Sequence, residues 1–190
     1  MKGGAGRERR SRSEKSGPAV KRRGRPEKSG PAGKAGPAVK GEIKMKILVI
    51  NGPNINMLGI REPDIYGKED FAELLRRTKK TGEELGFETE FYQSNHEGDL
   101  VDRIQEAYGN TDGIVINPGA YTHTSVAILD AVKAVGIPTV EVHISDVSRR
   151  EDFRQTSYIR KAAIATVMGK GIDGYGEALK ILKDYLEMMK

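Results

Sequence analysis

Two kinds of segment alternate along the chain from residue 45 onward. Short segments are either continuously apolar or alternate between apolar and polar residues, as strands of a packed sheet do. Longer segments carry apolar residues at the spacing of a helix, as Phe71–Leu85 does before Gly86. We predict strands at 46–50, 87–93, 113–117, 139–144 and 162–168. We predict helices at 71–85, 99–108, 125–135 and 175–189, with a short helix or turn at 150–156.

Strand and helix follow one another about five times in this part of the chain. Such alternation is typical of a parallel sheet covered by helices on both faces. We therefore expect an α/β fold, a flavodoxin-like three-layer sandwich with a five-stranded parallel sheet. The pattern does not determine the strand order, so the flavodoxin-like order is a hypothesis.

Residues 1–44 differ from the rest of the chain in composition. They contain almost no aliphatic residue larger than Ala, and they repeat the sequence EKSGPA at Glu14 and again at Glu27. Segments rich in Pro, Gly, Lys and Ser bury too little apolar area to offset the entropy of ordering. We predict a disordered basic tail over 1–44 and one folded domain over 45–190.

The excess positive charge lies in this tail. Residues 1–40 hold 13 Lys and Arg against 3 Glu, a net charge of +10, whereas the rest holds 19 basic and 24 acidic residues, a net charge of −5. The segment Arg23–Pro26 (RGRP) resembles the core of an AT-hook, which binds the minor groove of A·T-rich DNA. A chance match in an Arg-, Gly- and Pro-rich tail is the alternative. Met45 directly precedes the first predicted strand, so a wrongly chosen start codon is a further alternative.

Composition excludes several classes of chemistry. The chain has no Cys, which rules out disulfides, thiolate catalysis and cysteine metal sites. No apolar stretch approaches the roughly 18 residues of a membrane span, and the N-terminus lacks the apolar core of a signal peptide, so we expect a cytoplasmic protein. No dinucleotide fingerprint or Walker loop occurs, and no metal cluster is evident, because the histidines are isolated rather than paired at i, i+4.

Polar segments follow four of the predicted strands. They read NGPN after the first strand, QSNHEG after the second, NPGAYTHTS after the third and HISD after the fourth, and all three histidines of the chain lie in them. The carboxyl ends of parallel strands share one edge of the sheet, where open α/β folds bind ligands. The sequence therefore predicts a site for a small polar ligand at this edge.

Glu141 and His143 lie two residues apart on a predicted strand, so their side chains point to the same face. A carboxylate beside an imidazole fixes the tautomer of the ring and favours its protonated form, which suits a general acid. A salt bridge at the end of a strand, without catalytic use, explains the same spacing equally well.

Arg61 and Tyr66 lie in one loop, within REPDIYG. A free tyrosine is a poor base at neutral pH, but a neighbouring arginine favours the phenolate. Taken alone, the pair is typical of an ordinary surface loop.

Six blocks of the sequence, taken in order, resemble the signature of type II 3-dehydroquinate dehydratases. They are NGPNINMLGIREPDIYG (51–67), QSNHEG (93–98), NPGAYTHTSVAILDA (117–131), EVHIS (141–145), REDFRQTSYI (150–159) and GKGIDGYGEAL (169–179). The resemblance extends from about residue 46 to 182. It implies a flavodoxin-like catalytic domain at 45–190. It also implies a lyase that dehydrates 3-dehydroquinate to 3-dehydroshikimate, the third step of the shikimate pathway of aromatic amino acid biosynthesis.

The resemblance also implies roles for individual residues in an anti elimination through an enolate, without cofactor or metal. Tyr66 would be the general base, held as phenolate by Arg61, and His143 the general acid, oriented by Glu141. Asn54 would position a water molecule or donor toward the enolate oxygen. The substrate would be bound by Asn117, His123, Asp130, Ile144, Ser145 and Arg154.

The same resemblance implies a homo-oligomer, usually a dodecamer, in which Asp130 reaches the site of a neighbouring subunit. Two positions depart from the family pattern: Asp146 stands where Asn is usual, and Leu129 stands where Arg often precedes the aspartate. An extra negative charge at Asp146 should weaken binding of an anionic substrate unless Arg149 or Arg150 neutralises it.

Two rival interpretations remain. A flavodoxin-like binding module without catalysis would be expected to lack Tyr66, Arg61 or His143, and all three are present. A nucleic-acid-binding protein that acts through its tail is compatible with an enzymatic domain.

Overall fold

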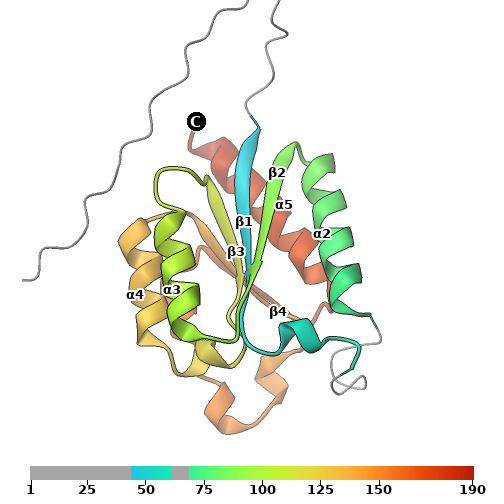
Figure 1. Ribbon diagram of the computed structural model, residues 1–190, viewed down its shortest axis with the longest axis vertical. Coiled ribbons are helices and arrows are strands. Elements are labelled where there is room, and N and C mark those ends of the chain that lie inside the picture. The colour runs from blue at the N-terminus through green and yellow to red at the C-terminus, as the bar shows by residue number, and fades with distance from the viewer. Residues whose placement is uncertain (1–43, 61–68) are drawn as a thin grey trace, which may run out of the picture. The chain divides into compact units, whose positions relative to one another are not determined.

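The computed structural model describes residues 44–60 and 69–190. Residues 1–43 of the predicted tail, with the AT-hook-like segment, therefore lie outside the described residues, as do Arg61 and Tyr66. Figure 1 shows the described part as a central sheet between two layers of helices.

The sheet contains five parallel strands in the order β2-β1-β3-β4-β5. This is the flavodoxin-like order, so both the expected fold and the hypothesis on strand order are confirmed. The strands are β1 Met45–Asn51, β2 Phe87–Gln93, β3 Gly113–Asn117, β4 Thr139–His143 and β5 Ala165–Met168.

In the described residues, four α-helices cover the sheet, two on each face (Figure 1). They are α2 Phe71–Glu84, α3 Glu97–Glu106, α4 Val126–Val135 and α5 Asp173–Met188. Short 3-10 helices occupy the loops: η1 Ile55–Met57, η2 Gly119–His123, η3 Val147–Arg149, η4 Asp152–Arg154 and η5 Ile159–Lys161. Among the described helices, none is long and apolar enough to cross a membrane.

The alternation of side chains along each strand divides the core into two clusters. On β1, Ile47 and Val49 pack with residues of α2 and α5, whereas Leu48 and Ile50 pack with residues of α3 and α4. All four side chains are fully buried. A strand covered on both faces must be apolar at successive positions, which explains the continuous apolar run in the sequence.

Local hydrogen bonds determine where the elements begin and end. Ser125 caps α4 by accepting from the backbone N–H of Ile128. The last strand was predicted to begin at residue 162, but it begins at Ala165. The difference arises because the N–H groups of Ala162 and Ala163 both turn back to the carbonyl of Ile159.

Candidate functional site

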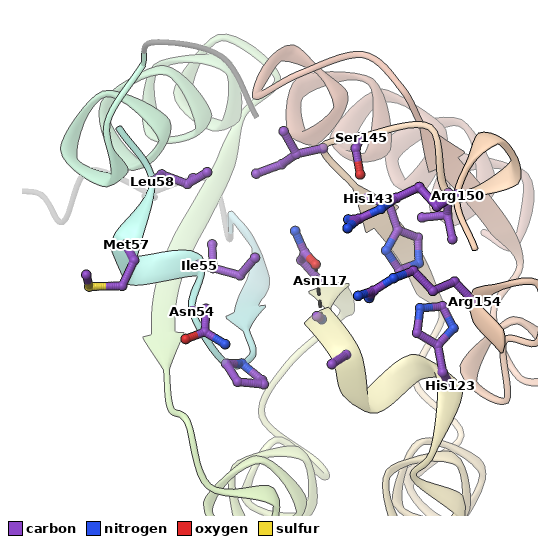
Figure 2. A pocket seen from close by; sticks show the side chains of 15 residues that line it. Asn54, Ile55, Met57, Leu58, Asn117, His123, His143, Ser145, Arg150 and Arg154 are labelled. Carbon is purple, nitrogen blue, oxygen red and sulfur yellow. Dashed lines mark hydrogen bonds between the residues drawn. The ribbon is translucent and has the colours of Figure 1, made fainter. Parts of the chain in front are cut away.

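A cavity of about 160 Å³ opens at the carboxyl ends of β1, β3 and β4 (Figure 2). It lies where the strand order reverses between β1 and β3, the usual ligand site of open α/β sheets. One wall comes from the segment after β1, the floor from the ends of β3 and β4, and the other wall from η2 and from the segment around η4. The prediction that the strand ends form a pocket is thus supported for three of the four polar segments.

Two glycines allow the segments after β1 and β3 to meet. A Cβ atom on Gly52 would lie 2.5 Å from the carbonyl oxygen of Pro118, a distance that no side chain tolerates. Gly119 adopts a positive φ of 58°, and a Cβ there would lie 3.0 Å from the carbonyl oxygen of Pro53. The N–H of Gly52 donates to the carbonyl of Asn117 at 2.7 Å. These contacts set the distance between two walls of the pocket.

The predicted pair of Glu141 and His143 is formed at the pocket floor. The Nε2 atom of His143 lies 2.8 Å from Oε1 of Glu141, whose side chain is fully buried. Because a carboxylate only accepts, Nε2 carries the hydrogen, which leaves Nδ1 as the ring nitrogen that can act on a ligand. His143 lines the cavity, whereas Glu141 lies behind it.

Glu141 is held as a carboxylate by its neighbours. Burial alone would raise its pKa, but hydrogen bonds from His143, Thr122 and Ser157, together with the charge of His143, hold the pKa below its usual 4.5. The hydroxyl of Thr166 also donates to Oε2, at 3.3 Å. Sequence reasoning identified Glu141 and His143 but not the three hydroxyls.

His123 presents one defined ring nitrogen to the cavity. Its Nδ1 lies 2.7 Å from the carbonyl oxygen of Thr156, so Nδ1 carries the hydrogen and Nε2 is left as an acceptor in the neutral ring. Burial lowers the pKa of His123, and the charges of His143 and Arg154 lower it further, against the opposing effect of the bond to Thr156. A neutral His123 can therefore accept a hydrogen bond from a ligand hydroxyl.

Asn117 is fixed at the end of β3 by a buried chain of hydrogen bonds. Its Nδ2 donates to the hydroxyl of Tyr175 at 2.9 Å, and that hydroxyl donates to Oδ1 of Asn51 at 2.6 Å. Its Oδ1 accepts from the N–H of Gly119 at 3.2 Å. These bonds fix the orientation of the Asn117 amide, and Asn117 lines the cavity. Tyr175 was not predicted as a site residue, because a Tyr on the apolar face of a helix is typical of the core.

Two arginines extend into the cavity from the segment around η4 (Figure 2). The Nε atom of Arg154 lies 2.9 Å from a carboxylate oxygen of Glu151, and the Nε atom of Arg150 lies 3.6 Å from the same oxygen. Both side chains are mostly buried. Among the described residues that line the cavity there is no Asp or Glu, so the cavity favours an anionic ligand.

Asn54, Ile144 and Ser145 also line the cavity. Asn54 adopts the left-handed conformation, with φ of 67°, and its N–H donates to Oδ1 of Asn95 at 3.0 Å. Ile144 and Ser145 directly follow β4.

Asp146 turns its carboxylate toward its own loop. Its Oδ1 accepts from the N–H and the hydroxyl of Ser148, at 3.1 and 2.6 Å, and its Oδ2 lies 3.3 Å from Nε of Arg149. The hydrogen bonds from Ser148 hold the pKa of Asp146 below its ordinary value. Of the two arginines considered as partners, Arg149 thus contacts Asp146, and Asp146 does not line the cavity.

Of the other predicted site residues, one is described and two are not. Asp130 is exposed on α4, away from the cavity lining. Arg61 and Tyr66 lie outside the described residues. Within the described ranges, no group of three His, Asp or Glu residues could hold a metal ion.

Comparisons with known proteins agree on one family. The sequence profile of the family described as Dehydroquinase class II matches residues 45–183. The 3-dehydroquinate dehydratase of Caldicellulosiruptor bescii is 54% identical over 143 residues, which cover 75% of this chain and 99% of the relative. That of Caldicellulosiruptor saccharolyticus is 56% identical over 142 residues, covering 74% of this chain and 98% of the relative.

Solved structures give the same result. The type II dehydroquinase of Butyrivibrio crossotus matches with a TM-score of 0.72 and 52% identity over 73% of this chain and 97% of that structure. The type II dehydroquinase of Propionibacterium acnes matches with a TM-score of 0.70 and 40% identity over 74% of this chain and 99% of that structure.

Proposed function

The chain belongs to the class II dehydroquinase family and dehydrates 3-dehydroquinate, and we propose that it does so by general acid–base catalysis at the cavity described above. The reaction removes a proton from C2 and the hydroxyl from C1, giving water and the conjugated enone 3-dehydroshikimate. Acid and base lie on opposite faces of the ring in an anti elimination. The enolate that forms after the first proton transfer carries the developing negative charge.

His143 is the general acid of this proposal. Its Nε2–H is bound to Glu141, so the proton passes from Nδ1 to the departing C1 hydroxyl. The buried Glu141 carboxylate stabilises the protonated ring before the transfer. The pairing of His143 with Glu141 on the floor of a pocket lined by cationic and amide groups is the observation that carries the proposal.

Tyr66 is the proposed general base, with Arg61 favouring its phenolate. Both residues lie outside the described part of the chain, and their assignment rests on the match of the block REPDIYG to the family. The described lining of the cavity offers two histidines as titratable groups other than arginine. His143 is assigned as the acid, and the choice of Tyr66 rather than His123 as the base rests on the family match.

The substrate carboxylate is bound where β4 ends, by Ile144 and Ser145, with help from Asn117. Tyr175 and Gly119 fix the orientation of the Asn117 amide. An amide N–H of Asn117 is a hydrogen-bond donor, as an anionic ligand requires. His123 and Arg154 bind the ring hydroxyls, and Arg150 contributes positive charge on the same wall. Asn54 positions a water molecule or donor toward the enolate oxygen.

Asp130 and the oligomer belong to the same proposal. Asp130 is exposed on α4, as a residue that reaches a neighbouring subunit must be. Leu129, also on α4, has an exposed fraction of 6% and faces the core. Sedimentation of the full-length protein tests the expected dodecamer.

The charge distribution favours a second activity for the tail. With +10 in residues 1–40 and −5 in the remainder, the tail is the part suited to bind DNA. Deleting residues 1–44 should abolish DNA binding, and the affinity of the full chain should fall steeply with salt. Equal binding by the full-length and shortened proteins would contradict this role.

Adding 3-dehydroquinate to the full-length protein tests the proposed reaction directly. The ultraviolet absorbance of a conjugated enone should grow with time and in proportion to enzyme concentration. Absence of growth would contradict the proposal and favour a binding module.

A further inference from the structure

Three hydroxyl groups from separate segments converge on the carboxylate of Glu141, on the side away from the cavity. Thr122 in η2 and Ser157 before η5 each donate to Oε1, and Thr166 in β5 donates to Oε2. Together with Nε2 of His143, they satisfy both oxygens of a side chain that has no exposed surface. None of the three residues lines the cavity.

Ser157 connects Glu141 with Thr122 and with the backbone of Arg160. Its Oγ lies 2.9 and 3.1 Å from the two oxygens of Glu141 and 2.9 Å from Oγ1 of Thr122. The N–H of Arg160 donates to the same Oγ at 3.0 Å. The neighbouring N–H of Tyr158 donates to the carbonyl of Thr122 at 2.8 Å, so both hydroxyls are held in place by backbone contacts.

Among the described residues, few charged groups face Glu141. His143 contacts it, Nε of the half-exposed Arg160 lies 4.0 Å away, and His123 acts on it through space. When His143 gives up its proton, the buried pair changes from a neutral ion pair to a single negative charge. Arg160 then remains as an ion-pair partner, but it is half-exposed and screened by solvent, so hydrogen bonds are also needed to stabilise the buried charge.

We propose that Thr122 and Ser157 are positioning residues of the proton donor, whose hydroxyls keep Glu141 ionised and fixed while His143 changes charge. This inference rests on the proposed role of His143 as the general acid. Hydrogen bonds to an ionised acceptor are stronger than those between neutral groups, so the two hydroxyls stabilise the state after proton transfer more than the state before it. They therefore make His143 a better acid.

Replacing a hydroxyl tests this inference through the pH dependence of the reaction. In the full-length protein, Ser157→Ala and Thr122→Val should each lower kcat about tenfold. In the pH profile of kcat, each substitution should also move the fall on the alkaline side to higher pH by about 0.5 to 1 unit. The reason is that the His143–Glu141 pair then holds its proton more tightly. Ser157→Thr and Thr122→Ser, which keep the hydroxyl, should restore both properties.

Thr124→Val is the matched control, because Thr124 lies two residues from Thr122 and is exposed. A fall in kcat without displacement of the limb would show a merely structural role and overturn the inference, as would variants with unchanged kcat. An NMR titration of the three histidines follows the His143–Glu141 pair independently of turnover. Absence of dehydratase activity in the unmodified protein would refute the proposed function, whereas the titration would still decide this inference.

Discussion

The side-chain amide of Asn117 donates a hydrogen bond of 2.9 Å to the hydroxyl of Tyr175, which is completely buried. The contact links α5 to the end of β3 and determines which side of the amide faces the cavity. Burial raises the pKa of Tyr175, so the hydroxyl stays protonated. It donates a hydrogen bond to Oδ1 of Asn51. Tyr175, a residue of the core, thereby orients the amide of Asn117, which lines the cavity.

Tyr175→Phe should lower both stability and substrate affinity. The variant leaves the Oδ1 of Asn51 and one N–H of Asn117 without partners in a buried region, at a cost of about 1–3 kcal/mol in the free energy of unfolding. KM should rise more than kcat falls, because the amide of Asn117 loses one of the two bonds that fix it. Urea unfolding and steady-state kinetics measure the two effects. Tyr108→Phe on the exposed surface is the control, and equal behaviour of the two variants would refute the role of Tyr175.

His143→Ala and Tyr66→Phe should each reduce kcat by about 10²–10⁴ while KM changes little, because each removes a proton-transfer group. His96→Ala is the control for the first variant, since His96 is exposed and does not line the cavity. Steady-state assays of the enone product compare them. Retention of near-normal kcat in either variant would show that its role has been assigned wrongly.

Asp146→Asn should lower KM or leave it unchanged. The carboxylate of Asp146 adds a negative charge to the loop beside the proposed site of the substrate carboxylate. Arg149 and Ser148 already bind the Asp146 carboxylate. Asn retains the oxygen that accepts from Ser148, so the loop should keep its shape. Kinetics at low and high salt measure the residual electrostatic effect. A sharp rise in KM would mean that the negative charge itself is required.

The lowered pKa of Glu141 has a consequence for acid stability. As the pH falls, the unfolded chain protonates this carboxyl first, near 4.5, while the folded protein still resists protonation. The contribution of Glu141 is therefore present above that pH and lost as the pH falls through the folded-state value. Glu141→Gln should weaken the dependence of unfolding free energy on pH in this acid range, measured by urea unfolding. Glu88→Gln, at an exposed position, should leave the pH dependence of the unfolding free energy unchanged. Identical pH profiles for both variants would contradict this account.

Much of the fold follows from local patterns. The apolar strands and the alternation of elements predict a parallel sheet, and parallel strands necessarily gather their polar ends at one edge. Glu141 and His143 were predicted to meet because a strand repeats every two residues. The start of the last strand was not predictable, since the apolar run from Ala162 to Ile164 satisfies both a turn and a strand.

Contacts made by irregular segments were beyond sequence reasoning. Ser157 reaches Glu141 from a loop with no repeating geometry, and nothing in its local sequence indicates a buried carboxylate nearby. Thr122 lies beside His123 in a polar block, which is the one signal that could have identified it. The same limit applies to Tyr175, whose partner Asn117 is 58 residues away along the chain.

The most direct test of acid–base catalysis without a covalent intermediate is the formation of enone before and after treatment of the full-length protein with borohydride in the presence of 3-dehydroquinate. Borohydride reduces a Schiff base to a stable amine and so inactivates an enzyme that works through a lysine. We predict the same rate of enone formation in treated and untreated samples. Loss of activity confined to the treated sample would contradict the roles assigned to His143 and Tyr66.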